Sequence, residues 1–303
     1  MTRSIVLLGS PTALGGHFGG MERTPAELRR HGLLERLRNR PGLAGASISD
    51  RGDVPNDPGW APDDDPRAKN RARICAYLPR LATATGEALG DEPADARLLA
   101  IGGDCTTHAG VMAGLRQSQP ERRLGLAWFD AHGDFNTPDT TPSGNVWGMP
   151  FAMICGRGEG DLVAAAAGPT VREEDAALLG GQVLDETESR LLAASRVAHF
   201  GAGMLATDGG QAALAGWAGT VARRVDGFYL AFDLDALDAA GGWSVAMPEA
   251  GGLSLETALD AIRAIRSAGP LVGFGATAVM FRDGNDPDPT IAAVAALAEA
   301  ALG

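Results

Sequence analysis

The 303-residue sequence has little of what a disulfide-stabilised, membrane-bound or nucleic-acid-binding protein needs. It contains three cysteines, Cys75, Cys105 and Cys155, and this odd number at wide spacing is typical of a reducing compartment. The first apolar run, which starts at Ile5, is too short for a signal or transmembrane segment. Basic residues are scarce, and the formal net charge of -12 argues against a nucleic-acid partner. We therefore expect a cytoplasmic protein that binds neither nucleic acid nor a membrane.

The apolar residues, by contrast, are numerous enough and suitably spaced for one large folded core. Hydrophobic residues make up 45% of the chain and charged residues 21%, which is ordinary for a globular protein, and we expect a single domain over residues 1–303. Short apolar runs alternate with amphipathic stretches, so we predict a three-layer α/β/α fold with a mostly parallel central sheet. The predicted strands are 5–8, 98–101, 124–129, 196–200, 228–232 and 271–274. The predicted helices are 24–38, 69–89, 106–117, 185–194, 210–215, 255–267 and 289–301.

Two segments near the N-terminus give more local predictions. Thr24, Pro25 and Glu27 resemble an N-cap, a first-turn proline and a capping glutamate, so a helix should start at Thr24 and continue to about Arg38. Residues 55–66 are rich in proline, aspartate and glycine without periodicity, which predicts a surface loop.

Acidic residues follow directly after two of the predicted strands. The run 124–129 leads into Asp130, His132 and Asp134, and the run 228–232 leads into Asp233 and Asp235. Alternate spacing points each set to one side of an extended segment, and parallel strands present such residues at one edge of a sheet. Four converging carboxylates would repel one another without a cation, so we predict a metal site rather than solvated loop acids.

The motifs around these residues resemble the arginase (ureohydrolase) superfamily, which includes agmatinases and formiminoglutamases. The family carries GGDH, DAHxD, SGNxHG and FDxDxxDP segments in this order. This sequence reads GGDC at 102–105, DAHGD at 130–134, SGNVWG at 143–148 and FDLDALDA at 232–239. The segments 20–29, 50–53 and 248–254 also look like family segments, so the resemblance covers most of the chain.

The resemblance implies two divalent metal ions, most typically Mn²⁺, and a small-molecule substrate. Asp130 and Asp233 would bridge the two ions. Cys105 and Asp134 would complete one site, and His132 and Asp235 would complete the other. A water held between the ions would attack a guanidinium or amidine carbon as hydroxide, with Asp134 passing its proton onward. Asn136 and Ser143 match positions that orient substrate in the family, whose members are commonly trimers or hexamers, so a homo-oligomer is compatible with the resemblance.

Cys105 stands where the family usually has histidine. A thiolate is a softer ligand and adds a negative charge, so it should shift the preference toward softer metals. The other interpretations are an inert buried thiol, or replacement of the ligand by His108 one helical turn further on.

Two further departures concern the substrate. Trp147 replaces the family's proton-carrying histidine, and tryptophan cannot carry a proton, which would penalise an arginine-like substrate by roughly 10²- to 10⁴-fold. Ala278 stands where the family's guanidine hydrolases place a glutamate that grips the guanidinium. Glu249 or Asp283 could reach in from neighbouring loops.

The acids that hold a substrate amino group in arginase-like enzymes are expected after the strand at 196–200. This chain has Gly203, Met204 and Ala206 there, with Asp208 as the nearest acid. A grip on an α-amino acid is therefore not expected from that segment.

Three functions are compatible with these residues. The first is hydrolysis of a carbon-nitrogen bond in a modified guanidine or amidine, because the family's Nω-hydroxy-L-arginine amidinohydrolases of D-cycloserine biosynthesis are similar in having cysteine for the first histidine and no shuttle histidine. That similarity favours secondary metabolism over arginine catabolism. The second is a metal-binding but catalytically silent relative, and the third is a hydrolase of a neutral amide or formimino compound.

Overall fold

A single eight-stranded sheet organises the chain in the computed structural model, which describes residues 3–56 and 65–303. Every pairing of neighbouring strands is parallel, and the strand order is β2-β1-β3-β8-β7-β4-β5-β6. The predicted α/β fold is confirmed. The strands are β1 Ser4–Ser10, β2 Ser47–Asp53, β3 Arg97–Gly102, β4 Leu124–Asp130, β5 Ala176–Gly180, β6 Ala198–Phe200, β7 Gly227–Asp233 and β8 Leu271–Thr277.

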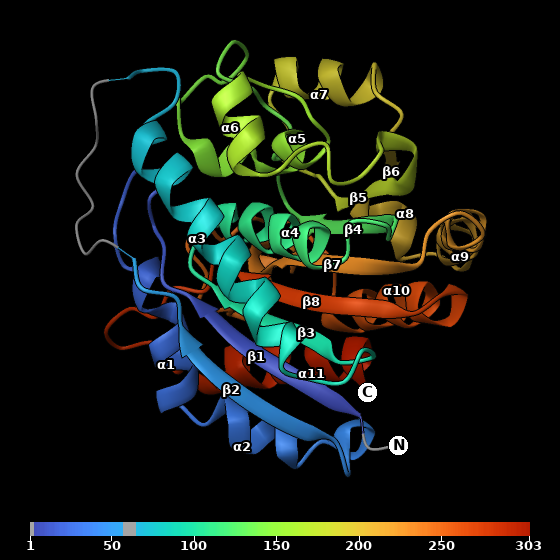
Figure 1. Ribbon diagram of the computed structural model, residues 1–303. Helices are drawn as coiled ribbons and strands as arrows, with labels where there is room; N and C mark the ends of the chain where they lie inside the picture. The colour runs from blue at the N-terminus through green and yellow to red at the C-terminus, as the bar shows by residue number, and fades with distance from the viewer. Residues whose placement is uncertain (1–2, 57–64) are drawn as a thin grey trace.

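Helices cover both faces of this sheet (Figure 1). Strand residues alternate between two cores, as β1 illustrates: Val6 and Leu8 pack into one hydrophobic cluster, and Ile5 and Leu7 pack into the other. The first cluster receives helices α3 Arg71–Gly90, α4 Thr106–Ser118, α5 Pro150–Ile154, α6 Gly160–Ala165 and α7 Glu186–Ala193. The second receives α1 Thr24–Arg30, α2 Leu33–Arg38, α8 Ala202–Leu205, α9 Asp208–Ala222, α10 Leu255–Ala268 and α11 Asp288–Leu302.

The structure corrects the prediction of one helix over residues 24–38. Gly32 adopts a left-handed conformation with φ of 82°, and this residue separates α1 from α2. Thr24 is the first residue of α1 and not its N-cap, and its buried hydroxyl donates a hydrogen bond to the backbone oxygen of Val279. The side chain thus connects α1 to the segment after β8 instead of capping its own helix.

Other elements were missed because their sequence signals are weak. Strand β5 reads AALLG, whose alanines and glycine do not stand out from the surrounding Ala-rich and Gly-rich sequence. Helices α5, α6 and α8 are too short for a periodic pattern, and α9 extends well beyond the predicted 210–215. Most of the loop predicted at 55–66 lies outside the described residues.

Five adjacent strands of the sheet, β3, β8, β7, β4 and β5, end at the same edge. Ligand sites of open parallel sheets form at this carboxyl edge, where loops from neighbouring strands meet. Cys105, Ala278, Asp233 and Asp130 follow or end four of these strands in that order. Within the described residues, no helix is long and apolar enough to cross a membrane.

Candidate metal centre

The exits of β4 and β7 bring four of the predicted metal ligands together. Asp130 and Asp233 are the last residues of these neighbouring strands, and each folds its carboxylate back to accept the backbone N–H two residues on, at 2.7 Å from His132 and 2.8 Å from Asp235. The Asp235 carboxylate accepts from Ala131 N at 3.2 Å, which joins the two exits. Nδ1 of His132 lies 3.3 Å from Asp130 and 3.4 Å from Asp235.

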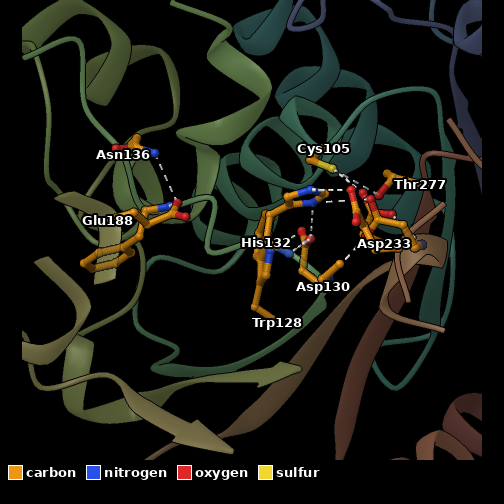
Figure 2. Close-up of polar contacts among 12 residues, drawn as sticks. Cys105, Trp128, Asp130, His132, Asn136, Glu188, Asp233 and Thr277 are labelled. Atoms are coloured by element: carbon orange, nitrogen blue, oxygen red, sulfur yellow. Dashed lines mark hydrogen bonds and ion pairs between the residues drawn. The ribbon is translucent and has the colours of Figure 1, made fainter. Parts of the chain in front are cut away.

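Cys105 approaches the Asp233 carboxylate from the end of β3, which β8 separates from β7 (Figure 2). It lies between β3 and α4, and its Sγ donates to Asp233 Oδ2 at 2.8 Å. Ligand atoms meet in two groups, Cys105 with Asp130 and Asp233, and Asp130 with His132 and Asp235, in each of which all atoms lie within 4.8 Å of one another. Asp130 belongs to both groups, as a residue that bridges two ions would.

Asp134 is outside these two groups but faces the same cavity. Its backbone has φ of 47°, a region that non-glycine residues seldom adopt, and its side chain is buried. The Oδ2 atom has no hydrogen-bond partner among the described residues. A buried carboxylate oxygen without a partner is costly, so this atom points to a cation or a water at the centre.

Burial and mutual repulsion shift the ionisation of this cluster. Burial and the nearby Asp235 raise the pKa of Asp130 to about 6 and hold the pKa of Asp233 well above its usual value. Burial and the carboxylates around it also raise the pKa values of Cys105 and Asp134. Burial disfavours a charged His132, yet hydrogen bonds to Asp130 and Asp235 raise its pKa overall.

The donor set fits divalent metal ions. Carboxylate oxygens, an imidazole nitrogen and a thiol are all ligands of divalent cations, and bound cations would relieve the burial and mutual repulsion that raise the pKa values of the carboxyl groups. The orphaned oxygen of Asp134 and the unpartnered Nε2 of His132 are further signs that these side chains are arranged for groups beyond the protein chain.

His108 does not take the place of Cys105 as a ligand. It is fully buried rather than on a helix surface, with Nδ1 3.0 Å from the Tyr229 hydroxyl and Nε2 3.0 Å from Thr277 Oγ1. Burial lowers the pKa of His108 to about 3, which leaves a neutral ring in a satisfied core position.

A cavity of about 370 Å³ opens above these ligands. The predicted substrate residues Asn136, Ser143 and Trp147 all line it, together with Cys105, His132, Asp134, Asp233 and Asp235. Among the described residues that line the cavity there is no lysine or arginine. The cavity is therefore acidic at its metal-binding floor and on its walls.

Two wall carboxylates, Asp185 and Glu188, were missed in the sequence. They follow β5 and line the cavity beside Asn136, whose Nδ2 donates to Asp185 at 2.9 Å. The same Nδ2 donates to Glu188 at 3.4 Å (Figure 2). Gly133 permits this approach, since a side chain there would meet the Glu188 carboxyl carbon at 2.5 Å. Burial and the nearby Asp185 raise the pKa of Glu188 to about 7.

The segment after 196–200, from which no grip on an amino group was expected, contributes no acid to the cavity wall. Gly203, Met204, Ala206 and Asp208 do not line the cavity, and the exit of β5 supplies the carboxylates instead. The only sequence signal for them was the weak strand pattern that precedes them.

Trp147 forms a wall of the cavity with the N-terminal loop. Its ring packs edge-on against His17 and Phe18, with centroids 5.2 and 5.4 Å apart. Gly16 gives the indole room, because a Cβ at this position would lie 2.3 Å from the ring. The tryptophan is thus built into the wall and contributes shape rather than a titratable group.

The comparisons with known proteins agree with this architecture. A model of the arginase family matches residues 3–303. The chain belongs to the arginase family. It is 30% identical over 257 residues to an arginase of Bacillus caldovelox, covering 83% of this chain and 82% of the relative. An arginase of Bacillus subtilis is 29% identical over 276 residues, covering 89% and 88%.

A solved arginase structure from Bacillus caldovelox matches with a TM-score of 0.86 and 28% identity, covering 100% of this chain and 98% of that chain. The resemblance to the arginase superfamily is confirmed, and the chain is an arginase-family hydrolase with candidate metal ligands at its carboxyl edge. Cys105, Trp147 and Ala278 all line the cavity, so the three departures concern the site itself.

Replacing Cys105 by histidine should raise the affinity of this site for Mn²⁺ by roughly 10-fold or more, because a thiol must lose its proton to bind whereas a neutral imidazole need not. The raised pKa of the Cys105 thiol makes that proton harder to remove. Isothermal titration of the metal-free protein with Mn²⁺ and Zn²⁺ would measure the change. Cys155→Ser, outside both ligand groups, is the control, and a fall in Mn²⁺ affinity for Cys105→His would contradict the softness argument.

Proposed function

We propose that this protein hydrolyses a carbon-nitrogen bond of a modified guanidine or amidine carried by an α-amino acid, of the Nω-hydroxy-L-arginine type, and that it does so with two divalent metal ions. The observation that carries this proposal is the pair of ligand groups that share Asp130, placed at the floor of a cavity whose wall carries two further carboxylates. Mn²⁺ is the metal we expect from the family.

The ligands divide between two positions. Asp130, which belongs to both ligand groups, would hold both ions. The family resemblance assigns the same role to Asp233, which lies in one group only. Cys105 and Asp134 would complete one position, and His132 and Asp235 the other. When bound, the ions would supply a water of lowered pKa and positive charge for the transition state. The chain's own contribution is to orient these side chains by the hydrogen bonds that join the ends of β4 and β7.

The substrate would be oriented by the part of the cavity wall that Asn136, Asp185 and Glu188 form. Asp185 and Glu188 offer two carboxylates to an ammonium group, and Asn136 already donates to both, which holds them in place. Ser143 lies later in the loop that follows Asn136, is exposed and also lines the cavity. An α-amino acid would therefore lie with its amino group at this wall and its reactive carbon over the metal ligands.

Bond cleavage requires a proton on the departing nitrogen. Asp134, with its free Oδ2 facing the cavity, is placed to accept a proton from the attacking water and return it to the nitrogen as the carbon-nitrogen bond breaks. Trp147 cannot relay a proton from solvent. A substrate whose departing nitrogen is weakly basic would need less of this help, and this favours a modified guanidine over arginine itself.

A catalytically silent relative is the second candidate. Trp147 replaces the histidine that carries a proton in the family, and Ala278 replaces the glutamate that binds the guanidinium. Metal analysis of the purified protein, followed by assays for urea, hydroxyurea and ammonia over guanidines, N-hydroxyguanidines, formimino compounds and amides, separates the two. We expect two ions per chain and fastest turnover of an N-hydroxyguanidine, lost in Asp134→Asn. Two ions with no turnover of any compound would establish the silent relative, and turnover of a neutral amide alone would establish the third candidate.

A further inference from the structure

Glu249 is a cavity carboxylate that accepts no hydrogen bond from the described residues. It lines the cavity, its side chain is 28% exposed, and its one ionic contact among the described residues is with Nε2 of His132 at 3.8 Å, beyond hydrogen-bond distance. The other wall acids, Asp185 and Glu188, each accept at least two hydrogen bonds.

Glu249 and Ala278 line the same cavity, and the chain that leads to Glu249 pairs with the segment of Ala278. Ala246 N donates to Ala278 O at 2.8 Å and Met280 N donates to Ser244 O at 2.9 Å, so the segment that leads to Glu249 pairs with the segment after β8. Arg282 strengthens the pairing with hydrogen bonds to the backbone oxygens of residues 245 and 246. Glu249 follows this paired segment by three residues and supplies a carboxylate to a cavity in which the methyl group of Ala278 offers no charge.

The partners of the other cavity acids indicate what this carboxylate would bind. Two divalent ions would bring positive charge to the carboxylates of the floor, and Asp185 and Glu188 accept hydrogen bonds from Asn136 and would face a substrate ammonium. Asp104, the remaining acid on the cavity, accepts hydrogen bonds from the backbone of Gly15 and Thr106. Glu249 is left without a cation, and none of the described cavity residues is a lysine or arginine.

From this arrangement we propose that Glu249 binds the cationic amidine or guanidine group of the substrate and thereby selects a positively charged head group over a neutral one. The inference rests on the proposed function for the identity of the cavity as the substrate site. It distinguishes Glu249 from Asp283, the other acid near this wall, which is exposed and does not line the cavity.

A matched pair of amino acids tests this without turnover. L-Arginine and L-citrulline share the same α-amino acid end, but arginine ends in a guanidinium and citrulline in a neutral ureido group. The ratio of their dissociation constants for the metal-loaded full-length protein therefore measures the contribution of the charged head group. Nω-Hydroxy-L-arginine serves as a second cation, and its binding is followed by rapid mixing before turnover. Glu249→Gln, which keeps the side-chain shape, should weaken binding of both cations roughly 10- to 100-fold and leave citrulline unchanged.

Three controls make the result decisive. Asp283→Asn should leave all three constants unchanged, Asp185→Asn should weaken all three alike, and the metal content of Glu249→Gln should equal that of the wild type. If Glu249→Gln loses metal while its ratio of arginine to citrulline affinity stays that of the wild type, the role of Glu249 is to orient His132. That result would overturn the proposal. Equal weakening of cations and citrulline, or a wild-type protein that does not prefer the cations, would overturn it too. Absence of turnover with the binding ratio still dependent on Glu249 would refute only the proposed function.

Discussion

Asp130→Asn should abolish the binding of both metal ions and lower kcat/KM by on the order of 10³-fold or more, because loss of one shared ligand removes both ions from the catalytic centre. Asp130 is the residue that the two ligand groups share. An amide is a far poorer ligand than a carboxylate and removes one of the negative charges that attract the ions. Metal content after gel filtration and the rate with the best substrate of the panel would measure both effects.

The comparison with Asp235→Asn locates the effect. Asp235 belongs to only one group, so its replacement should leave about one ion per chain, in contrast to none for Asp130→Asn. Far-ultraviolet circular dichroism of both metal-free variants checks that the fold is intact. Two ions bound by Asp130→Asn with wild-type affinity would refute the assignment of Asp130 as the shared ligand.

Removal of the metal ions with a chelator should lower the melting temperature by about 10 °C at pH 8, since ligands present at about 1,000 times their dissociation constants contribute about 4 kcal/mol to stability. The carboxylates of the floor and the buried Cys105 then lose the cations that offset their repulsion. The loss is expected in the folding equilibrium of the whole chain, because Asp130 and Asp233 end two central strands of its one sheet.

The melting temperature of the metal-free protein should itself depend on pH, and the raised pKa values give the direction of the change. Burial, and then the nearby Asp235, raise the pKa of Asp130 in the folded state from 3.8 to about 6. A carboxyl group with a raised folded pKa contributes stability that is fully present below its unfolded value and is lost as the pH rises through the folded value. The raised pKa of Glu188, about 7, acts in the same direction. The metal-free protein should therefore melt at a higher temperature at pH 5 than at pH 8.

Metal binding opposes the fall in melting temperature from pH 5 to pH 8, because the ligands must be deprotonated to bind and the ions therefore bind more tightly at the higher pH. The difference in melting temperature between the loaded and the chelated protein should widen from pH 5 to pH 8. Differential scanning calorimetry with and without chelator at both values measures it, and Asp235→Asn should narrow the difference. A difference that is constant with pH would mean that the floor carboxylates are not the metal ligands.

The floor of the site was predictable because each of its motifs is local. Asp130, His132, Asp233 and Asp235 stand within a few residues of strongly apolar strands, so the sequence alone places them at strand ends. The predicted alternation along an extended segment is wrong for Asp235, because Leu234–Ala236 form a 3-10 helix, and the Asp130 and Asp233 carboxylates accept from the backbone two residues on. Their meeting required only that the two strands lie parallel at one edge of a sheet. The structure added that β4 and β7 are immediate neighbours, which joins their exits by the hydrogen bond from Ala131 to Asp235.

The walls were not predictable in the same way. Asp185 and Glu188 follow a strand whose short Ala-rich sequence lacks a clear pattern, and their position depends on β5 pairing with β4. Thr24 carried a capping signal, yet its hydroxyl is taken by the backbone of Val279 far along the chain. Local propensity was overridden in both cases by contacts between distant segments.

The sequence by itself determined which residues bind the metals in our proposal and that the chain has an arginase-like α/β fold, since both follow from residue types and short spacings. Only the tertiary structure decided which acids face the substrate. Glu249 lines the cavity just after a segment, residues 244–246, that pairs with the chain following β8, and Asp134 keeps a free oxygen because no described group donates a hydrogen bond to it. Such facts depend on which strands are neighbours and on how loops from distant parts of the chain pack. That arrangement is set by burial of the whole core and not by any single motif.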